Sequence, residues 1–148
     1  MSEPLSPETV AIIKSTAPAL QQHGLEITTR MYQRLFVDAD IKKLFDEAKQ
    51  KSGEQPKRLA AAILAFANNV DKLEAIDGAV NNICARHVKT HIKAEHYPAV
   101  ANALLPAIKD VLGDMATDEV LAAWGQAYWY LADLMIGREK LLYENDPI

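Results

Sequence analysis

The stretch "NNICARHVKTH", residues 81–91, contains the residue on which the interpretation of the chain depends. Across residues 73–88, apolar side chains recur at intervals of three and four, which is the spacing of one face of an α-helix. The residues of that face are Ile76, Val80, Ile83 and His87. A histidine therefore stands where the pattern requires a core residue. It is either a buried histidine satisfied by a neighbour, or a ligand for something that the protein binds.

Helical spacing continues along most of the chain, and no β-branched run alternates with period two, so the sequence predicts an all-α fold. Ser6 and Pro7 are typical of a helix start, and Gly24 is expected to end this first helix. A second helix is expected to follow at once. Its predicted inward residues are Thr28, Tyr32, Leu35 and Phe36. A short turn, "DADIKKLF", then leads to Phe45, and a polar loop, "DEAKQKSG", follows.

The second half of the chain predicts further helices. Gln55 and Pro56 are expected to open a helix whose inward residues are Leu59, Ile63, Phe66 and Val70. After the helix over residues 73–88, another is expected from Tyr97 to Gly113, with a kink at Pro106. The last helix should extend from about residue 117 to 143. Its inward residues are predicted to be Leu121, Trp124, Tyr128, Leu131, Met135, Glu139 and Leu142.

Composition restricts the classes of protein that fit. A chain of 148 residues with 49% hydrophobic and 24% charged residues is typical of one globular domain. A net charge of −4 without a basic cluster argues against nucleic-acid binding. The start, "MSEPLSPETV", lacks the features of a signal peptide and no window is apolar enough to span a membrane, so we expect a cytoplasmic protein. Cys84 is the only cysteine, which excludes an internal disulfide.

Glu139 is a second polar residue on an apolar face, and it offers a partner for His87. If the two helices pack together, the carboxylate can accept a hydrogen bond from one ring nitrogen and leave the other as an acceptor or ligand. Tyr97 can donate its hydroxyl to the same carboxylate. Helical spacing alone fits a structural His–Glu pair equally well. The sequence argues against a structural zinc site, because Cys84 has no second cysteine or suitable histidine pair to complete four ligands. No glycine-rich phosphate loop, nucleophile elbow or HExxH motif is present.

A set of residues and motifs occurs in a characteristic order along the chain. The set is Tyr32, Phe45, "EQPKRLA", "ARHV", "EHYP", "AWGQAYWYLAD" and "REKLLY". Together they resemble the bacterial haemoglobins, both the single-domain globins of the Vitreoscilla type and the haem domains of flavohaemoglobins. The similarity extends from "IIKSTAPALQQHG" to "LLYE". It implies a globin fold, a three-over-three helical sandwich around a haem pocket, with residues 1–148 forming a single haem-binding domain.

The resemblance also implies roles for individual residues. His87 would be the proximal ligand of a haem b iron, with Glu139 and Tyr97 as its hydrogen-bonding network. The expected pocket residues are Phe45 against the porphyrin, Tyr32 and Gln55 on the distal side, and Leu59 and Val100 as walls. His87 would then face the core because the haem is part of the core.

The function that the resemblance implies is reversible binding and delivery of oxygen, with nitric oxide and carbon monoxide as further ligands. One alternative is a nitric oxide dioxygenase or peroxidase-like haem domain, in which Tyr32, Gln55, Tyr97 and Glu139 assist the reaction. Because the sequence ends at "LLYENDPI", we expect a separate flavin reductase to supply its electrons. An alternative of another class is a haem-free sensor or interaction module. A homodimer is typical of the proteins that the chain resembles.

Overall fold

The computed structural model describes residues 5–43, 54–90 and 92–145, and every regular element within those ranges is helical, as the sequence predicts. The α-helices are α1 (Pro7–Leu35), α2 (Ala39–Lys42), α4 (Glu54–Asn68), α5 (Asp77–Lys89), α6 (Tyr97–Leu112) and α7 (Asp118–Asn145). Short 3₁₀ helices connect some of them, namely η1 (Leu73–Ile76), η2 (Ala94–His96) and η3 (Gly113–Met115). Phe45, His91 and the stretch 46–53, which the sequence predicts to be a polar loop, lie outside the described residues.

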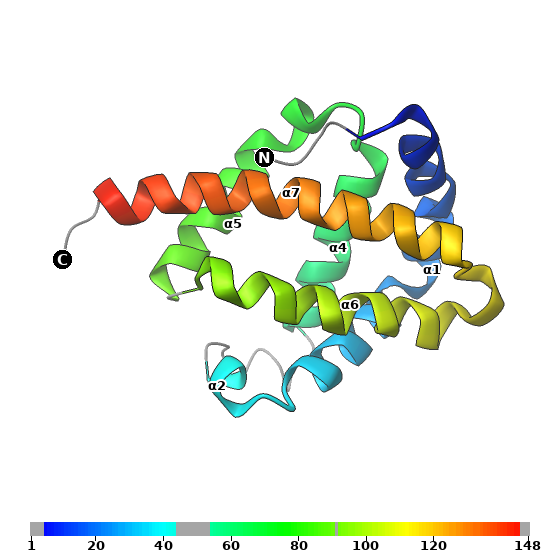
Figure 1. The fold of residues 1–148 in the computed structure, drawn as a ribbon, viewed down its shortest axis with the longest axis horizontal. Coiled ribbons are helices and arrows are strands. Elements are labelled where there is room, and N and C mark those ends of the chain that lie inside the picture. The colour runs from blue at the N-terminus through cyan, green and yellow to red at the C-terminus, as the bar shows by residue number, and fades with distance from the viewer. Residues whose placement is uncertain (1–4, 44–53, 91, 146–148) are drawn as a thin grey trace.

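The helices pack in two crossing groups. In Figure 1, α6 and α7 run side by side across the front, and α4 crosses behind them. Helix α1 packs against α4, α6 and α7, whereas α5 packs mainly against α7. Although α4 and α5 are neighbours in the chain, their described residues make little direct contact with each other.

Local signals explain several helix ends. The Ser6 hydroxyl accepts a hydrogen bond from the Thr9 amide at 3.2 Å, so Ser6 caps α1 as predicted. The Asp38 carboxylate caps α2 in the same way. Gly113 has a φ of 57°, a left-handed conformation that glycine adopts without steric cost, and it ends α6. Helix α6 continues through Pro106 without a break, and the kink expected at this residue stays a prediction.

The expectation that Gly24 ends the first helix is wrong, because α1 continues through it to Leu35. Glycine within a helix costs only about 1 kcal/mol relative to alanine, which packing can offset. Here Gly24 is buried, and a Cβ at this position would lie 3.3 Å from the Cβ of Ala60 on α4. Gly24 therefore permits the close approach of two helices.

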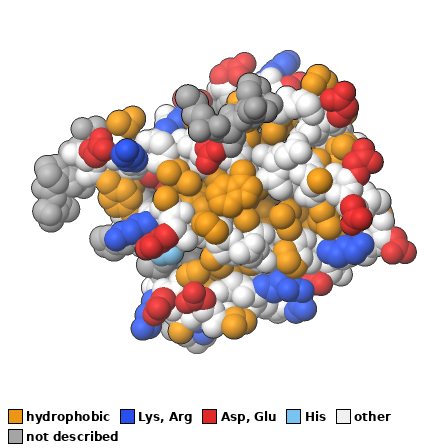
Figure 2. Space-filling view, in the orientation of Figure 1, with side chains coloured by type: hydrophobic (Ala, Val, Ile, Leu, Met, Phe, Trp, Pro, Cys, Tyr) orange, Lys and Arg blue, Asp and Glu red, His pale blue; other side chains and the backbone are white. Residues whose placement is uncertain are grey.

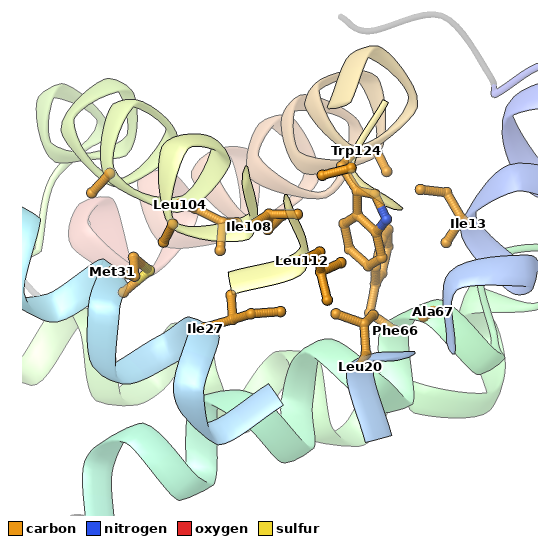
Figure 3. Close-up of a cluster of buried hydrophobic side chains, with 14 of the residues drawn as sticks. Ile13, Leu20, Ile27, Met31, Phe66, Ala67, Leu104, Ile108, Leu112 and Trp124 are labelled. Atoms are coloured by element: carbon orange, nitrogen blue, oxygen red, sulfur yellow. The ribbon is translucent and has the colours of Figure 1, made fainter. Parts of the chain in front are cut away.

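The buried apolar residues form two clusters. The main cluster joins α1, α2, α4, α6 and α7, and Figure 3 shows Met31, Ile108, Phe66 and Trp124 among its members. The second cluster is much smaller and joins α5, the start of α6 and the second half of α7. It consists of Val80, Cys84, Tyr97, Ala132 and Met135. The core is thus divided at α5.

Most predicted inward positions are buried or half-buried, with two differences. Leu142 is exposed, because it lies in the last turns of α7. On α5, the fully buried residues are Val80 and Cys84, while Ile83 and His87 are half-buried. The buried face of α5 is therefore turned slightly from the predicted one, and His87 lies at its edge.

Figure 2 shows apolar side chains gathered along the middle of the face that α6 and α7 form, with charged side chains mainly around its margin. None of the described helices combines the length and apolar character needed to cross a bilayer.

Candidate functional site

Three polar side chains from three helices meet beside the smaller core cluster. His87 comes from the last turns of α5, Tyr97 is the first residue of α6, and Glu139 projects from α7. His87 Nδ1 lies 2.8 Å from Glu139 Oε2. The Tyr97 hydroxyl lies 2.7 Å from Oε2 and 2.9 Å from Oε1 of the same carboxyl group. The structure therefore brings together the three residues that the sequence singled out on different helices.

The chemistry of the contact fixes the tautomer of His87. A carboxylate oxygen only accepts hydrogen bonds, so Nδ1 must carry the proton that it donates to Glu139. In a neutral imidazole the other nitrogen, Nε2, then keeps an unprotonated lone pair. Among the described residues, no hydrogen-bond donor is found for Nε2. His87 can therefore bind an electron-pair acceptor through the lone pair of Nε2.

Burial makes this cluster sensitive to substitution. Glu139 is 3% exposed, whereas the His87 side chain is 31% exposed, so the imidazole contacts a buried carboxylate and is itself only partly buried. Burial, followed by the hydrogen bond to Glu139, raises the pKa of the Tyr97 hydroxyl well above its ordinary value. Tyr97 therefore stays protonated and donates to Glu139 over the whole physiological range.

Two further tyrosines, Tyr128 and Tyr143, bind the main chain around the cluster, although the sequence pattern assigns neither of them to the site. The Tyr128 hydroxyl donates to the Tyr97 carbonyl at 2.7 Å. The Tyr143 hydroxyl donates to the Ile92 carbonyl at 2.6 Å, and the Ile92 amide donates to the His87 carbonyl at 2.8 Å. Both hydroxyls bind backbone carbonyls, an interaction without a sequence signature beyond a tyrosine on an inward helix face.

Further hydrogen bonds connect α5 to α7 beside the cluster. Arg138 donates to Asp77 at 2.6 Å and to Asn81 at 2.7 Å, which connects α7 to the first turns of α5. The buried Cys84 thiol faces the Met135 carbonyl at 3.8 Å. Burial is the main cause that raises the pKa of this thiol, to about 11, so Cys84 is a protonated core residue.

The residues predicted for the distal side, Tyr32 and Gln55, lie on α1 and α4, and the predicted pocket walls, Leu59 and Val100, lie on α4 and α6. Tyr32 is buried in α1, with its ring centroid 5.3 Å from that of Phe36. Gln55 is half-buried in the first turn of α4. Leu59 and Val100 are half-buried and pack against the main core cluster. Their roles in the pocket stay predictions.

Surface grooves lie both beside the cluster and away from it. One of about 380 Å³ adjoins Glu139, and its lining residues are Lys93, Ala94, Ile136, Glu139, Lys140, Tyr143 and Glu144. A larger one, of about 440 Å³, lies between the end of α1, α2 and α6 and contains none of the predicted site residues. No group of three or more acidic, histidine or cysteine side chains suited to a metal ion occurs among the described residues.

Comparison with known proteins identifies the family. Residues 29–135 match the family model described as Globin. A flavohemoprotein of Xylella fastidiosa is 51% identical over 145 residues, which cover 98% of this chain and 36% of that protein. The chain therefore spans about a third of the length of the flavohemoproteins that it matches.

Solved structures agree with this assignment. A bacterial globin from Campylobacter jejuni superposes with a TM-score of 0.88 at 41% identity, covering 94% of this chain and 99% of that one. The flavohemoglobin of Malassezia yamatoensis, solved with bound FAD and haem, gives a TM-score of 0.86 at 27% identity, covering 96% of this chain and 38% of that one. The predicted all-α globin fold is confirmed.

Proposed function

Given that the chain belongs to the globin family, we propose that it binds haem through His87 and reversibly binds diatomic gases, oxygen above all. The observation that most directly supports this is the His87–Glu139 contact, which fixes the imidazole with Nδ1 protonated and Nε2 available. A neutral imidazole nitrogen of this kind is the usual proximal ligand of haem iron in globins.

The division of the apolar core beside His87 fits the binding of an apolar group. Helices α4 and α5 make little direct contact within the described residues, and the apolar core is divided between them. Leu59 on α4 and Val100 on α6 belong to the rim of the main cluster and keep part of their surface accessible. Haem would supply the apolar surface that joins the two clusters, with His87 as iron ligand and Leu59 and Val100 as walls. Phe45, the proposed porphyrin contact, lies outside the described residues.

When bound, the haem supplies an iron atom that coordinates a gas molecule, and the chain's own residues determine how strongly. Glu139 accepts from His87, which makes the imidazole a better electron donor to a metal. Tyr97 holds the carboxylate in position. On the distal side, Tyr32 and Gln55 would donate hydrogen bonds to a polar gas ligand. One charge-assisted hydrogen bond contributes about 1.5–3 kcal/mol, or roughly a tenfold to hundredfold change in affinity.

A second candidate is nitric oxide dioxygenation or peroxidase-like activity, and the first of these is favoured by the 35% identity to an engineered form of a putative nitric oxide dioxygenase from Rhodothermus marinus. The same residues, Tyr32, Gln55, Tyr97 and Glu139, would then position the gas and strengthen electron donation from His87. Such activity requires an electron donor, for which we propose a flavin reductase as partner.

An optical spectrum tests the proposal directly. Purified protein reconstituted with haemin and reduced should show a Soret band that shifts reversibly with oxygen and with carbon monoxide. Nitric oxide consumption that begins only when a flavin reductase and its reductant are added would favour the second candidate. A colourless protein that gains no Soret band from haemin would overturn both and favour a haem-free sensor or interaction module.

The haem type, the domain organisation, the cellular location and the quaternary state each need a separate measurement. We propose haem b as the chemical form, which a pyridine haemochrome spectrum identifies. We also propose that residues 1–148 form a single haem-binding domain and that the protein is a cytoplasmic homodimer. Limited proteolysis, cell fractionation and sedimentation measure these properties.

A further inference from the structure

We propose that Gly24 and Thr28 of α1 position the first turn of α4, and through it Gln55, relative to Tyr32. The contact between α1 and α4 would then set how strongly the distal side favours oxygen over carbon monoxide. This inference rests on the proposed function, because it concerns the gas pocket of a haem-loaded protein. Gly24 and Thr28 are positioning residues, since they act on the pocket through α4.

The first support is a buried hydrogen bond between the two helices. Thr28 is fully buried, at 0% exposure, and its hydroxyl lies 2.9 Å from the Pro56 carbonyl. The same hydroxyl lies 3.2 Å from the Leu25 carbonyl of its own helix. Pro56 is itself buried and directly follows Gln55 in the first turn of α4. A bond to the Pro56 carbonyl therefore fixes the backbone beside Gln55.

The second support is the close approach one helical turn earlier. A Cβ on Gly24 would lie 3.3 Å from the Ala60 Cβ, which is closer than apolar carbons normally pack. Gly24, Thr28 and Tyr32 are spaced by four residues, so they lie along one face of α1. Their partners Ala60 and Pro56 are also one turn apart on α4. Two contacts along this row fix both the distance between the two helices and the position of the first turn of α4 along α1.

This arrangement links packing to ligand discrimination. A displacement of α4 by a few tenths of an ångström would move Gln55 while Tyr32 stays with α1. Hydrogen bonds weaken steeply as distance and angle depart from their optimum, so a small shift matters for a polar ligand. Carbon monoxide accepts hydrogen bonds more weakly than oxygen and should respond less.

One matched pair of substitutions isolates the hydroxyl. Thr28→Val keeps the branched shape and removes the hydrogen bond, whereas Thr28→Ser keeps the bond. Thr9→Val is the control, because Thr9 is also buried on α1 but bonds to Gln126, whose helix is α7. The readouts are the C–O stretching frequency of the carbon monoxide adduct, the oxygen dissociation rate, and thermal unfolding of the haem-free protein.

We expect Thr28→Val to shift the C–O stretching frequency and to speed oxygen dissociation by about threefold to tenfold, the effect of one weakened hydrogen bond. Thr28→Ser should resemble the wild type in both. Thr9→Val should lower thermal stability without changing either spectroscopic value. If Thr28→Val loses stability but keeps the wild-type frequency and rate, the positioning role is overturned.

Moving a methyl group from α4 to α1 by two substitutions provides a test that does not depend on Thr28. Gly24→Ala adds a methyl group against Ala60 and should shift the C–O frequency, and adding Ala60→Gly should restore it by removing the opposing methyl. Ala60→Gly alone should lower stability without the shift. Failure of the double variant to restore the frequency would contradict the inference. A wild-type protein that never forms a Soret band would instead overturn the proposed function, and this inference with it.

Discussion

Replacing Glu139 by glutamine removes one negative charge from a side chain that is 3% exposed while keeping its shape. The wild-type carboxylate receives the His87 Nδ1 proton at 2.8 Å and the Tyr97 hydroxyl at 2.7 Å. An amide has one accepting oxygen and an NH₂ group that only donates. In Glu139→Gln, one neutral amide oxygen must therefore accept from both donors, as Oε2 does in the wild type, and the second oxygen, which accepts from Tyr97 at 2.9 Å, is lost.

The expected loss follows from these contacts. Hydrogen bonds to a charged group contribute about 1.5–3 kcal/mol, against about 0.5–1.5 kcal/mol for neutral ones, so weakening two of them costs about 2 kcal/mol. Relief of the desolvation cost of the buried carboxylate offsets part of this, and we expect a net loss of about 1–2 kcal/mol in unfolding free energy. Glu139→Leu should lose about 2–4 kcal/mol, because it leaves the buried Tyr97 hydroxyl without its acceptor.

Urea unfolding of the haem-free protein at neutral pH measures both variants. Glu144→Gln is the control, because Glu144 is exposed on the same helix and should change the unfolding free energy little. In the haem-loaded ferrous protein, Glu139→Gln should also lower the iron–histidine stretching frequency. A Glu139→Leu protein as stable as the wild type, or frequencies equal in all variants, would refute the assignment of Glu139 as the acceptor that holds His87 and Tyr97.

Four other outcomes are expected. His87→Ala should abolish haem ligation through the protein, so haemin titration should give no five-coordinate ferrous spectrum. Tyr32→Phe should speed oxygen dissociation by roughly tenfold to hundredfold, with a smaller effect on carbon monoxide, in stopped-flow measurements. Cys84, whose pKa burial raises to about 11, should react with a thiol reagent far more slowly in native than in urea-unfolded protein. Hydrogen bonds from two arginines on α1 lower the pKa of Asp110, so its stabilisation is present at neutral pH and lost as pH falls through that lowered value. Asp110→Asn should therefore flatten the acid branch of a stability–pH curve.

The helical architecture was predictable because apolar spacing records which face each helix buries. The same spacing placed His87 and Glu139 on inward faces, and this was enough to anticipate their contact. Spacing failed where a residue's role depends on a partner elsewhere in the chain. Gly24 has the local signature of a helix end, but its missing side chain serves the approach of Ala60, 36 residues later.

Other details of the site lay beyond sequence reasoning for a related reason. The hydroxyls of Tyr128 and Tyr143 donate to backbone carbonyls, and any chain segment can offer such an acceptor. Helix α5 packs mainly against α7, so its buried face is narrow and is centred on Val80 and Cys84. A pattern that assumes a broad inward face cannot separate Cys84 from Ile83.

The division of the core predicts the order in which the helices unfold locally. Among the described residues, α5 contributes only Val80 and Cys84 to a cluster of five, whereas the main cluster holds twenty. Helices with little buried apolar surface open first, so amide protons of α5 should exchange with solvent before those of α1 and α6. A ligand that binds only the closed form shifts this opening equilibrium by mass action. Haem bound to His87 would therefore slow amide exchange most in α5. The helix that supplies the iron ligand would then be stabilised against local unfolding mainly by the haem that it binds.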